Sequence, residues 1–173
     1  MKAHQMMPVV GFAVLLSACG GNDTATSEYG IALAHQLDAL HAEQAGHFSE
    51  ISTISSVGLI GSAESDHARR MDDHLAEMSR IMGGLMACAD GTAAPLDVAG
   101  LAALTHDLHL ECDQHGILML SAQAMANVGT EEGRHQSTTG NVIEKMRRQL
   151  NTMMQPGSGY DTCSRCPSCG MKR

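Results

Sequence analysis

Residues 64–81 read Glu-Ser-Asp-His-Ala-Arg-Arg-Met-Asp-Asp-His-Leu-Ala-Glu-Met-Ser-Arg-Ile, and their pattern decides the fold. Steps of three and four residues connect one set of positions, and charged residues fill most of the positions between them. This spacing places the set on one face of an α-helix. The set consists of Glu64, His67, Met71, His74, Met78 and Ile81. We therefore predict a helix whose inward face mixes apolar residues with histidine and glutamate.

Three further segments between the prolines of the chain show the same rhythm, in a composition rich in helix-forming residues. Their inward positions are Leu33, Leu37, Leu40, Gln44, His47, Ile51 and Ile54; Leu101, Leu104, Leu108, Cys112, His115, Met119 and Ala122; and Glu132, His135, Thr139, Val142, Met146, Leu150 and Met153. We expect breaks at Val57–Gly61, Ala89–Pro95 and Val128–Thr130, with Ser62 and Thr130 as helix N-caps. Such short connections predict an all-α, antiparallel four-helix bundle over residues 31–155.

An internal repeat relates the two halves of this predicted bundle. The text Leu-His-x-Glu-x3-His occurs at residues 40–47 and again at residues 108–115. The text Gly-x2-Glu-x2-His occurs at residues 61–67 and again at residues 129–135, so both motifs recur after 68 residues. We therefore predict that the bundle consists of two duplicated αα-hairpins, residues 31–88 and 97–155, which bring their polar inward residues to one shared centre.

Composition excludes some classes of function. The formal net charge is −8, and the chain has two Phe, two Tyr and no Trp. A basic patch interleaved with aromatic residues is absent, so we expect no nucleic-acid partner. The sequence does not identify a protein partner.

The recurring inward polar residues predict a transition-metal site. Buried imidazoles without partners are costly, and a metal ion removes that cost by using their nitrogens as ligands. The candidate ligands are His47, His67, His115, His135, Glu64, Glu132, Glu43, Glu111, Met71, His74 and Cys112. The alternative for Glu64 and Glu132 is that they lie in the first helical turn, where the helix dipole favours a carboxylate.

The Glu-x-x-His pairs at Glu64/His67 and Glu132/His135 resemble those of the ferritin-like di-iron bundles. In that family the first and third helices each add a Glu, which this chain replaces with His47 and His115. The resemblance implies metal binding in the bundle core. A histidine-rich donor set suits copper or zinc at least as well as iron, and the His-x3-Met spacings (67/71, 74/78 and 115/119) favour copper.

The sequence near the N-terminus predicts where the protein resides in the cell. An apolar run from Met6 to Leu16 follows Lys2, and it is too short to remain as a membrane-spanning helix. The run ends in Leu-Ser-Ala-Cys19, which resembles the lipobox of bacterial lipoproteins. The resemblance implies a signal peptide over residues 1–18, lipidation of Cys19, a flexible tether over residues 19–30 and anchoring at the periplasmic face of the outer membrane.

Residues 156–173 form a cysteine-rich tail that contains Cys163, Cys166 and Cys169. Their Cys-x2-Cys-Pro-x-Cys-Gly spacing resembles one knuckle of a zinc ribbon or rubredoxin site, but a closed site needs a fourth ligand. The tail therefore has three interpretations: a second metal site, a disulfide formed in an oxidising compartment, or no role.

Together these patterns predict a membrane-anchored lipoprotein that binds a transition metal (copper, zinc or iron) for storage, buffering or sensing. The alternatives are a ferritin-like di-metal oxidase or peroxidase, a b-type haem protein, and an interaction module without metal. We expect binding rather than catalysis, and no residue is predicted to be catalytic.

Overall fold

Four long segments of the chain form helices, as their periodicity predicts. The computed structural model describes residues 28–88 and 94–155. Over these residues it consists of α1 (Glu28–Thr53), the 3-10 helix η1 (Val57–Leu59), α2 (Ile60–Cys88), α3 (Ala94–Ser121) and α4 (Met125–Met153), with no strand. The prediction of an all-α fold of four helices is confirmed.

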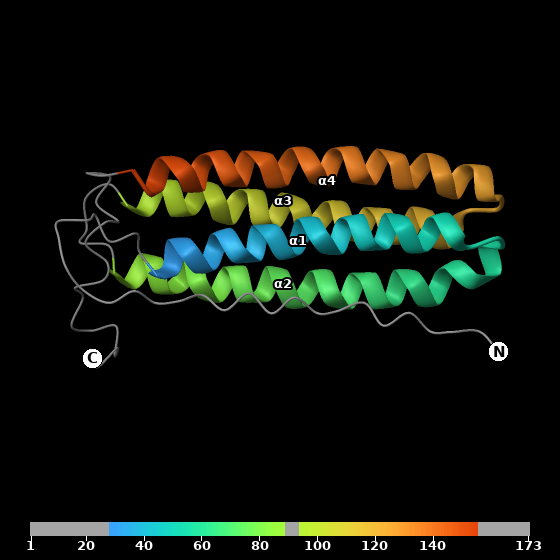
Figure 1. Ribbon diagram of the computed structural model, residues 1–173, viewed down its shortest axis with the longest axis horizontal. Helices are drawn as coiled ribbons and strands as arrows, with labels where there is room; N and C mark the ends of the chain where they lie inside the picture. Colours follow the sequence, from blue (N-terminus) through green and yellow to red (C-terminus); the bar gives the residue numbers. More distant parts are fainter. Residues whose placement is uncertain (1–27, 89–93, 156–173) are drawn as a thin grey trace, which may run out of the picture.

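The helices pack against one another as a bundle (Figure 1). Each long helix contacts the next along the chain, and α4 also contacts α1. The turn that follows α1 and the turn that precedes α4 lie at the same end of the bundle in Figure 1. We call this the turn end.

Two apolar clusters form the core. The larger cluster contains Leu33, Leu37, Leu40, Met71, Leu75, Met78, Ile81, Met82, Leu85, Val98, Leu101, Leu108, Val142, Ile143, Met146, Leu150 and Met153. The smaller cluster, near the turn end, contains Ile51, Ile60, Ala63, Met119 and Val128. Along every helix, the buried histidines and glutamates lie between residues of these two clusters. A polar layer therefore interrupts an otherwise apolar core.

One of the expected breaks is wrong. Val128–Thr130 are helical, because α4 begins earlier, at Met125. Val128 is fully buried in the smaller cluster, and this packing holds an additional helical turn around the Gly129-Thr130 pair. The other two breaks differ in their limits: α2 already includes Ile60 and Gly61, and α3 already includes Pro95. Proline is well suited to a first helical turn, where its missing N–H is not needed.

The expected N-caps are also wrong. Ser62 lies inside α2, and its hydroxyl donates a long hydrogen bond to the Leu59 carbonyl (3.5 Å). Thr130 lies inside α4, and its hydroxyl donates to the Ala126 carbonyl (2.9 Å). Both hydroxyl groups therefore bond to a carbonyl that precedes them in the chain, that of Ser62 in η1 and that of Thr130 in α4.

None of the helices in residues 28–88 and 94–155 combines the length and the apolar character that crossing a bilayer requires.

Candidate metal centre

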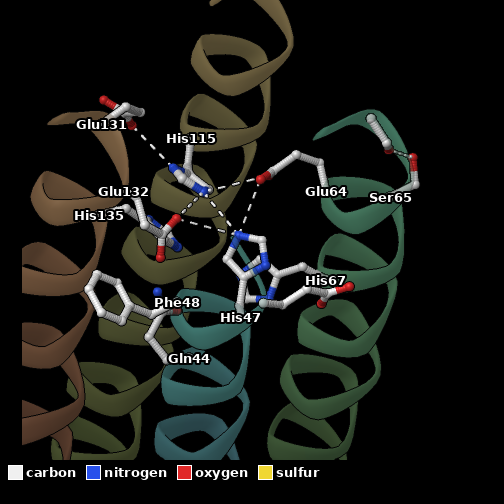
Figure 2. A network of polar contacts seen from close by, with 12 residues as sticks. Gln44, His47, Phe48, Glu64, Ser65, His67, His115, Glu131, Glu132 and His135 are labelled. Atoms are coloured by element: carbon white, nitrogen blue, oxygen red, sulfur yellow. Dashed lines mark hydrogen bonds and ion pairs between the residues drawn. The ribbon is translucent and has the colours of Figure 1, made fainter. Parts of the chain in front are cut away.

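Six polar side chains from all four long helices meet in the layer between the apolar clusters, and we call them the central cluster. None of them exposes more than 4% of its surface. Figure 2 shows that they point toward one another. Helix α1 contributes His47, α2 contributes Glu64 and His67, α3 contributes His115, and α4 contributes Glu132 and His135.

The centre of this cluster is formed by two imidazoles and two carboxylates. The Nε2 atoms of His47 and His115 lie 3.5 Å apart. Glu64 approaches both rings with different oxygens, Oε1 at 3.2 Å from His47 Nε2 and Oε2 at 3.5 Å from His115 Nε2. Glu132 Oε2 lies 3.5 Å from His47 Nε2 and 3.3 Å from His115 Nε2. Four potential ligand groups thus converge on one small volume.

The other two imidazoles stack on the first pair. His67 lies parallel to His47, and His135 lies parallel to His115, each with ring centroids 3.8 Å apart. The rings of His67 and His135 are nearly perpendicular to each other, at 85° and a centroid distance of 5.9 Å. The two stacks are related by the same 68-residue offset as the sequence repeat.

Carboxylates outside the cluster fix the orientation of these two rings. Glu43 Oε1 lies 2.9 Å from His67 Nδ1, and Glu111 Oε1 lies 3.0 Å from His135 Nδ1. An ionised carboxylate only accepts hydrogen bonds, so Nδ1 carries the proton and Nε2 carries the free lone pair. Both Nε2 atoms are buried and have no hydrogen-bond partner among the described residues. This is the carboxylate–histidine arrangement that accompanies metal-ligating histidines.

Arginines in turn hold these carboxylates. Arg70 Nε donates to both oxygens of Glu43 at 2.8 Å. Arg134 donates to Glu111 Oε2 at 3.0 Å. Although burial alone would raise the pKa of Glu43, its hydrogen bonds with His67 and Arg70 lower it below the ordinary value. Glu43 therefore stays ionised and keeps accepting from His67.

The remaining two histidines differ in their Nδ1 contacts. His115 Nδ1 lies 3.2 Å from Glu131 Oε1, and Arg134 holds Glu131. His47 Nδ1 is buried, and none of the residues in the described ranges forms a hydrogen bond with it. The residue that corresponds to Glu131 in the first repeat is Ala63. The central cluster is therefore symmetric in the stacking of its rings. It is asymmetric in the contacts at Nδ1, because His115 has a carboxylate partner there and His47 has none in the described part of the chain.

Burial and neighbouring charges shift the pKa values of the cluster in both directions. Burial, and then the proximity of His47, lowers the pKa of His67 to about 4. Burial and His115 likewise lower the pKa of His135. Burial acts in the same direction on His115, but the carboxylates of Glu132, Glu64 and Glu131 outweigh it and raise its pKa. His67 and His135 are thus neutral at pH 7, which is the form that binds metal.

Three members of the cluster satisfy the distances expected of a metal site. One ligand atom each from His47, His115 and Glu132 lies within 4.8 Å of the others, and all three residues are buried. Glu64 contacts the same two histidines, and the neighbouring rings of the two stacks, His67 and His135, carry buried Nε2 atoms without a partner among the described residues. The cluster therefore offers only nitrogen and oxygen ligands.

The other predicted ligands lie elsewhere or act indirectly. Glu43 and Glu111 contact Nδ1 atoms at the rim of the cluster. Met71 is fully buried in the larger apolar cluster, and Cys112 packs against that cluster with its pKa raised to about 12 by burial. His74 Nδ1 pairs with Gln36 Oε1 at 3.1 Å. The predicted lipidation site Cys19 and the tail residues Cys163, Cys166 and Cys169 lie outside the described residues.

The expected first-turn position of two glutamates is wrong. Glu64 lies more than one turn inside α2, which begins at Ile60, and Glu132 lies about two turns inside α4, which begins at Met125. The helix dipole acts mainly within the first turn. It therefore does not account for these two buried carboxylates.

Sequence reasoning missed two supporting residues, Glu131 and Gln136. Glu131 orients His115, and Gln136 donates to Glu132 Oε1 at 3.1 Å and to the Gln44 carbonyl at 2.7 Å. The Gln44 side chain is buried, and its amide forms no hydrogen bond within the described part of the chain. One signal in the sequence could have found Gln136: it follows Glu132 of the Glu-x-x-His pair by four residues, or about one helical turn.

Comparison of this chain with protein-family models, with curated proteins and with solved structures gives no match.

Proposed function

We propose that this protein binds a transition-metal ion in the central cluster. The observation that carries the proposal is the pair of buried, unpartnered Nε2 atoms on His67 and His135. Glu43 and Glu111 leave these two lone pairs free, on rings that stack against His47 and His115, the two histidines of the three-residue ligand group.

Energetics support this proposal. A buried polar atom without a hydrogen bond costs about 1–3 kcal/mol, and the cluster contains several such atoms. A bound ion replaces the missing partners, so the cost falls once metal is present. A set of carboxylates and neutral imidazoles suits zinc, copper or iron, and these three remain the candidates.

The duplication is part of the same proposal. We propose that the bundle is an antiparallel pair of duplicated hairpins, each of which supplies half of the ligands. Matching contacts support it: the pairs His67–Glu43 and His135–Glu111, and the two parallel stacks, agree within 0.1 Å in distance. Selection for packing alone does not require polar contacts to be kept in both copies.

The biological role follows from the predicted N-terminus. We propose a lipoprotein that is anchored through Cys19, faces the periplasm and stores, buffers or senses metal there. The lipobox-like sequence of residues 6–19 is the evidence for the lipid anchor. The His47, His115 and Glu132 group in the core is the evidence for metal binding.

Elemental analysis of the purified full-length chain tests the metal-binding proposal. We expect copper, zinc or iron in the protein, and loss of that metal in a His47→Ala, His115→Ala double variant that remains helical by circular dichroism. Because the tail could also bind metal, the matched control is a Cys163→Ser, Cys166→Ser, Cys169→Ser variant, which we expect to retain the core ion. Metal-free protein that takes up none of these ions would instead support an interaction module.

A di-metal oxidase or peroxidase is a second candidate, and Glu64 is the observation that favours it. Its two oxygens lie near two different histidines, so one carboxylate is placed to bridge two ions. Two iron ions per chain together with turnover of oxygen or peroxide would favour this enzyme. A Soret absorption band would identify the haem alternative.

A further inference from the structure

A groove between α1 and α4 reaches the central cluster. Its volume is about 240 Å³, and its lining includes Glu132, the buried ligand candidate on α4. The rest of the lining is Phe48, Ile51, Ser52, Ile54, Met125, Val128 and Gly129. Figure 2 shows the Phe48 ring beside Glu132, one residue after His47 on α1. The groove therefore connects the molecular surface with a carboxylate of the cluster.

The repeat provides a comparison with the opposite seam, between α2 and α3. The groove residue Gly129 corresponds to Gly61, and Ser52 corresponds to Leu120. A Cβ atom placed on Gly129 would meet no atom within 4 Å, whereas one on Gly61 would lie 3.6 Å from a Leu120 methyl group. Leucine thus covers the glycine of one seam, and the shorter serine leaves the other seam open.

His47 precedes the groove residue Phe48 and differs from the other three histidines of the central cluster at its Nδ1 atom. Carboxylates contact Nδ1 of His67, His115 and His135. His47 Nδ1 lacks such a contact with any described residue, so polar contacts reach this ring only through Nε2, which lies 3.2 Å from Glu64 Oε1. A ligand without an orienting partner rotates away from an ion more easily than one whose second nitrogen is fixed.

We infer that divalent metal ions enter and leave through the α1–α4 groove, where Glu132 is the first ligand they meet and His47 is the ligand that detaches. This inference rests on the proposed metal-binding function and adds the route and the exchanging ligand. The equivalent position in the α2–α3 seam does not serve as the route, because the Leu120 side chain packs next to Gly61 there.

Exchange kinetics of zinc test the route. All measurements use the full chain with the Cys163→Ser, Cys166→Ser, Cys169→Ser substitutions, which we call the background chain. In this chain the tail cysteines cannot bind zinc, so the measured zinc exchange is that of the central cluster. Ser52→Leu with Gly129→Leu copies the leucine of the opposite seam and fills the groove. We expect zinc uptake and chelator-driven zinc release to slow by about tenfold or more, as for binding that must wait for a conformational opening, with unchanged zinc stoichiometry.

Two further variants complete the test. Leu120→Ser is the reciprocal variant: it uncovers Gly61 in the opposite seam, and we expect exchange as fast as or faster than that of the background chain, in contrast to the slowing in the filled groove. Phe48→Ala widens the groove, and we expect faster exchange in both directions. Exchange at the background rate in both groove variants, or acceleration only in Leu120→Ser, would overturn the inferred route. A background chain that binds no zinc, copper or iron at all would instead refute the proposed function.

Discussion

At the residue scale, Glu43 and Glu111 decide which nitrogen of His67 and His135 faces the cluster. Each carboxylate accepts from Nδ1, which leaves the Nε2 lone pair directed inward. In the proposed metal site, these two carboxylates would position the ligands and keep them in the correct tautomer rather than bind the metal themselves.

Substitution of Glu43 measures this positioning effect. Glu43→Gln keeps the size of the side chain but removes the charge that fixes the His67 tautomer, so we expect zinc affinity to fall by about 10–100-fold. Competition with a chromophoric chelator gives the affinity. The control is Glu50→Gln, because Glu50 also contacts Arg70 (3.7 Å) but is not one of the carboxylates that hold a histidine ring of the central cluster. The zinc affinity of this variant should equal that of the wild type. Equal zinc affinities in the wild type, Glu43→Gln and Glu50→Gln would show that Glu43 does not position His67 for metal binding.

Protonation of His67 makes the metal-free fold sensitive to acid. Burial lowers the His67 pKa from 6.5 to about 4, so between these values the unfolded chain binds a proton that the folded chain does not. The stability of the metal-free protein should therefore fall as the pH decreases from 6.5 toward 4. Urea unfolding at several pH values in the presence of a chelator measures it. The free energy of unfolding should depend less steeply on pH in His67→Asn than in the wild type. An unchanged pH dependence would contradict the assignment to His67.

The sequence predicted the residues of the cluster but not their contacts. Helical spacing alone places Glu43 one turn from His47 on α1, so it was expected among the ligands. Which nitrogen of His67 it contacts depends on how α1 and α2 are rotated against each other, and a single helix carries no such information.

At the element scale, tertiary packing rather than local signals determines where helices begin. The Gly129-Thr130 pair is typical of a turn and cap, yet α4 passes through it because Val128 and Met125 pack at the turn end. The inward stripes were predictable from a regular period of apolar residues. The helix starts were not, because they depend on contacts with the other three helices.

Two adjacent glycines of α2 provide a test of this packing. A Cβ atom on Gly83 would meet no atom within 4 Å, whereas one on Gly84 would overlap the Tyr29 ring of α1. Gly83→Ala should stabilise the protein by about 0.5–1 kcal/mol through the better helix propensity of alanine. Gly84→Ala should destabilise it, because the ring must move. Chemical denaturation of the two variants measures both effects, and equal stabilisation by both would show that α1 does not pack on Gly84.

At the scale of the whole molecule, the central cluster joins all four helices between the two apolar clusters. An ion held by the proposed ligands would contact side chains from several helices and would bind only the folded state. Metal at one hundred times its dissociation constant should therefore stabilise the fold by about 2.7 kcal/mol. Thermal unfolding with and without zinc measures the shift. Zinc should raise the unfolding temperature of the His47→Ala, His115→Ala variant little or not at all. A shift as large as that of the wild type would place the ion elsewhere.

X-ray absorption at the zinc edge tests the central claim most directly, using the zinc-loaded full chain with Cys163, Cys166 and Cys169 replaced by serine. The central cluster predicts a first shell of nitrogen and oxygen at about 2.0–2.1 Å, with the outer-shell signal of several imidazole rings. A shell dominated by sulfur at about 2.3 Å, or one without imidazole scattering, would contradict it.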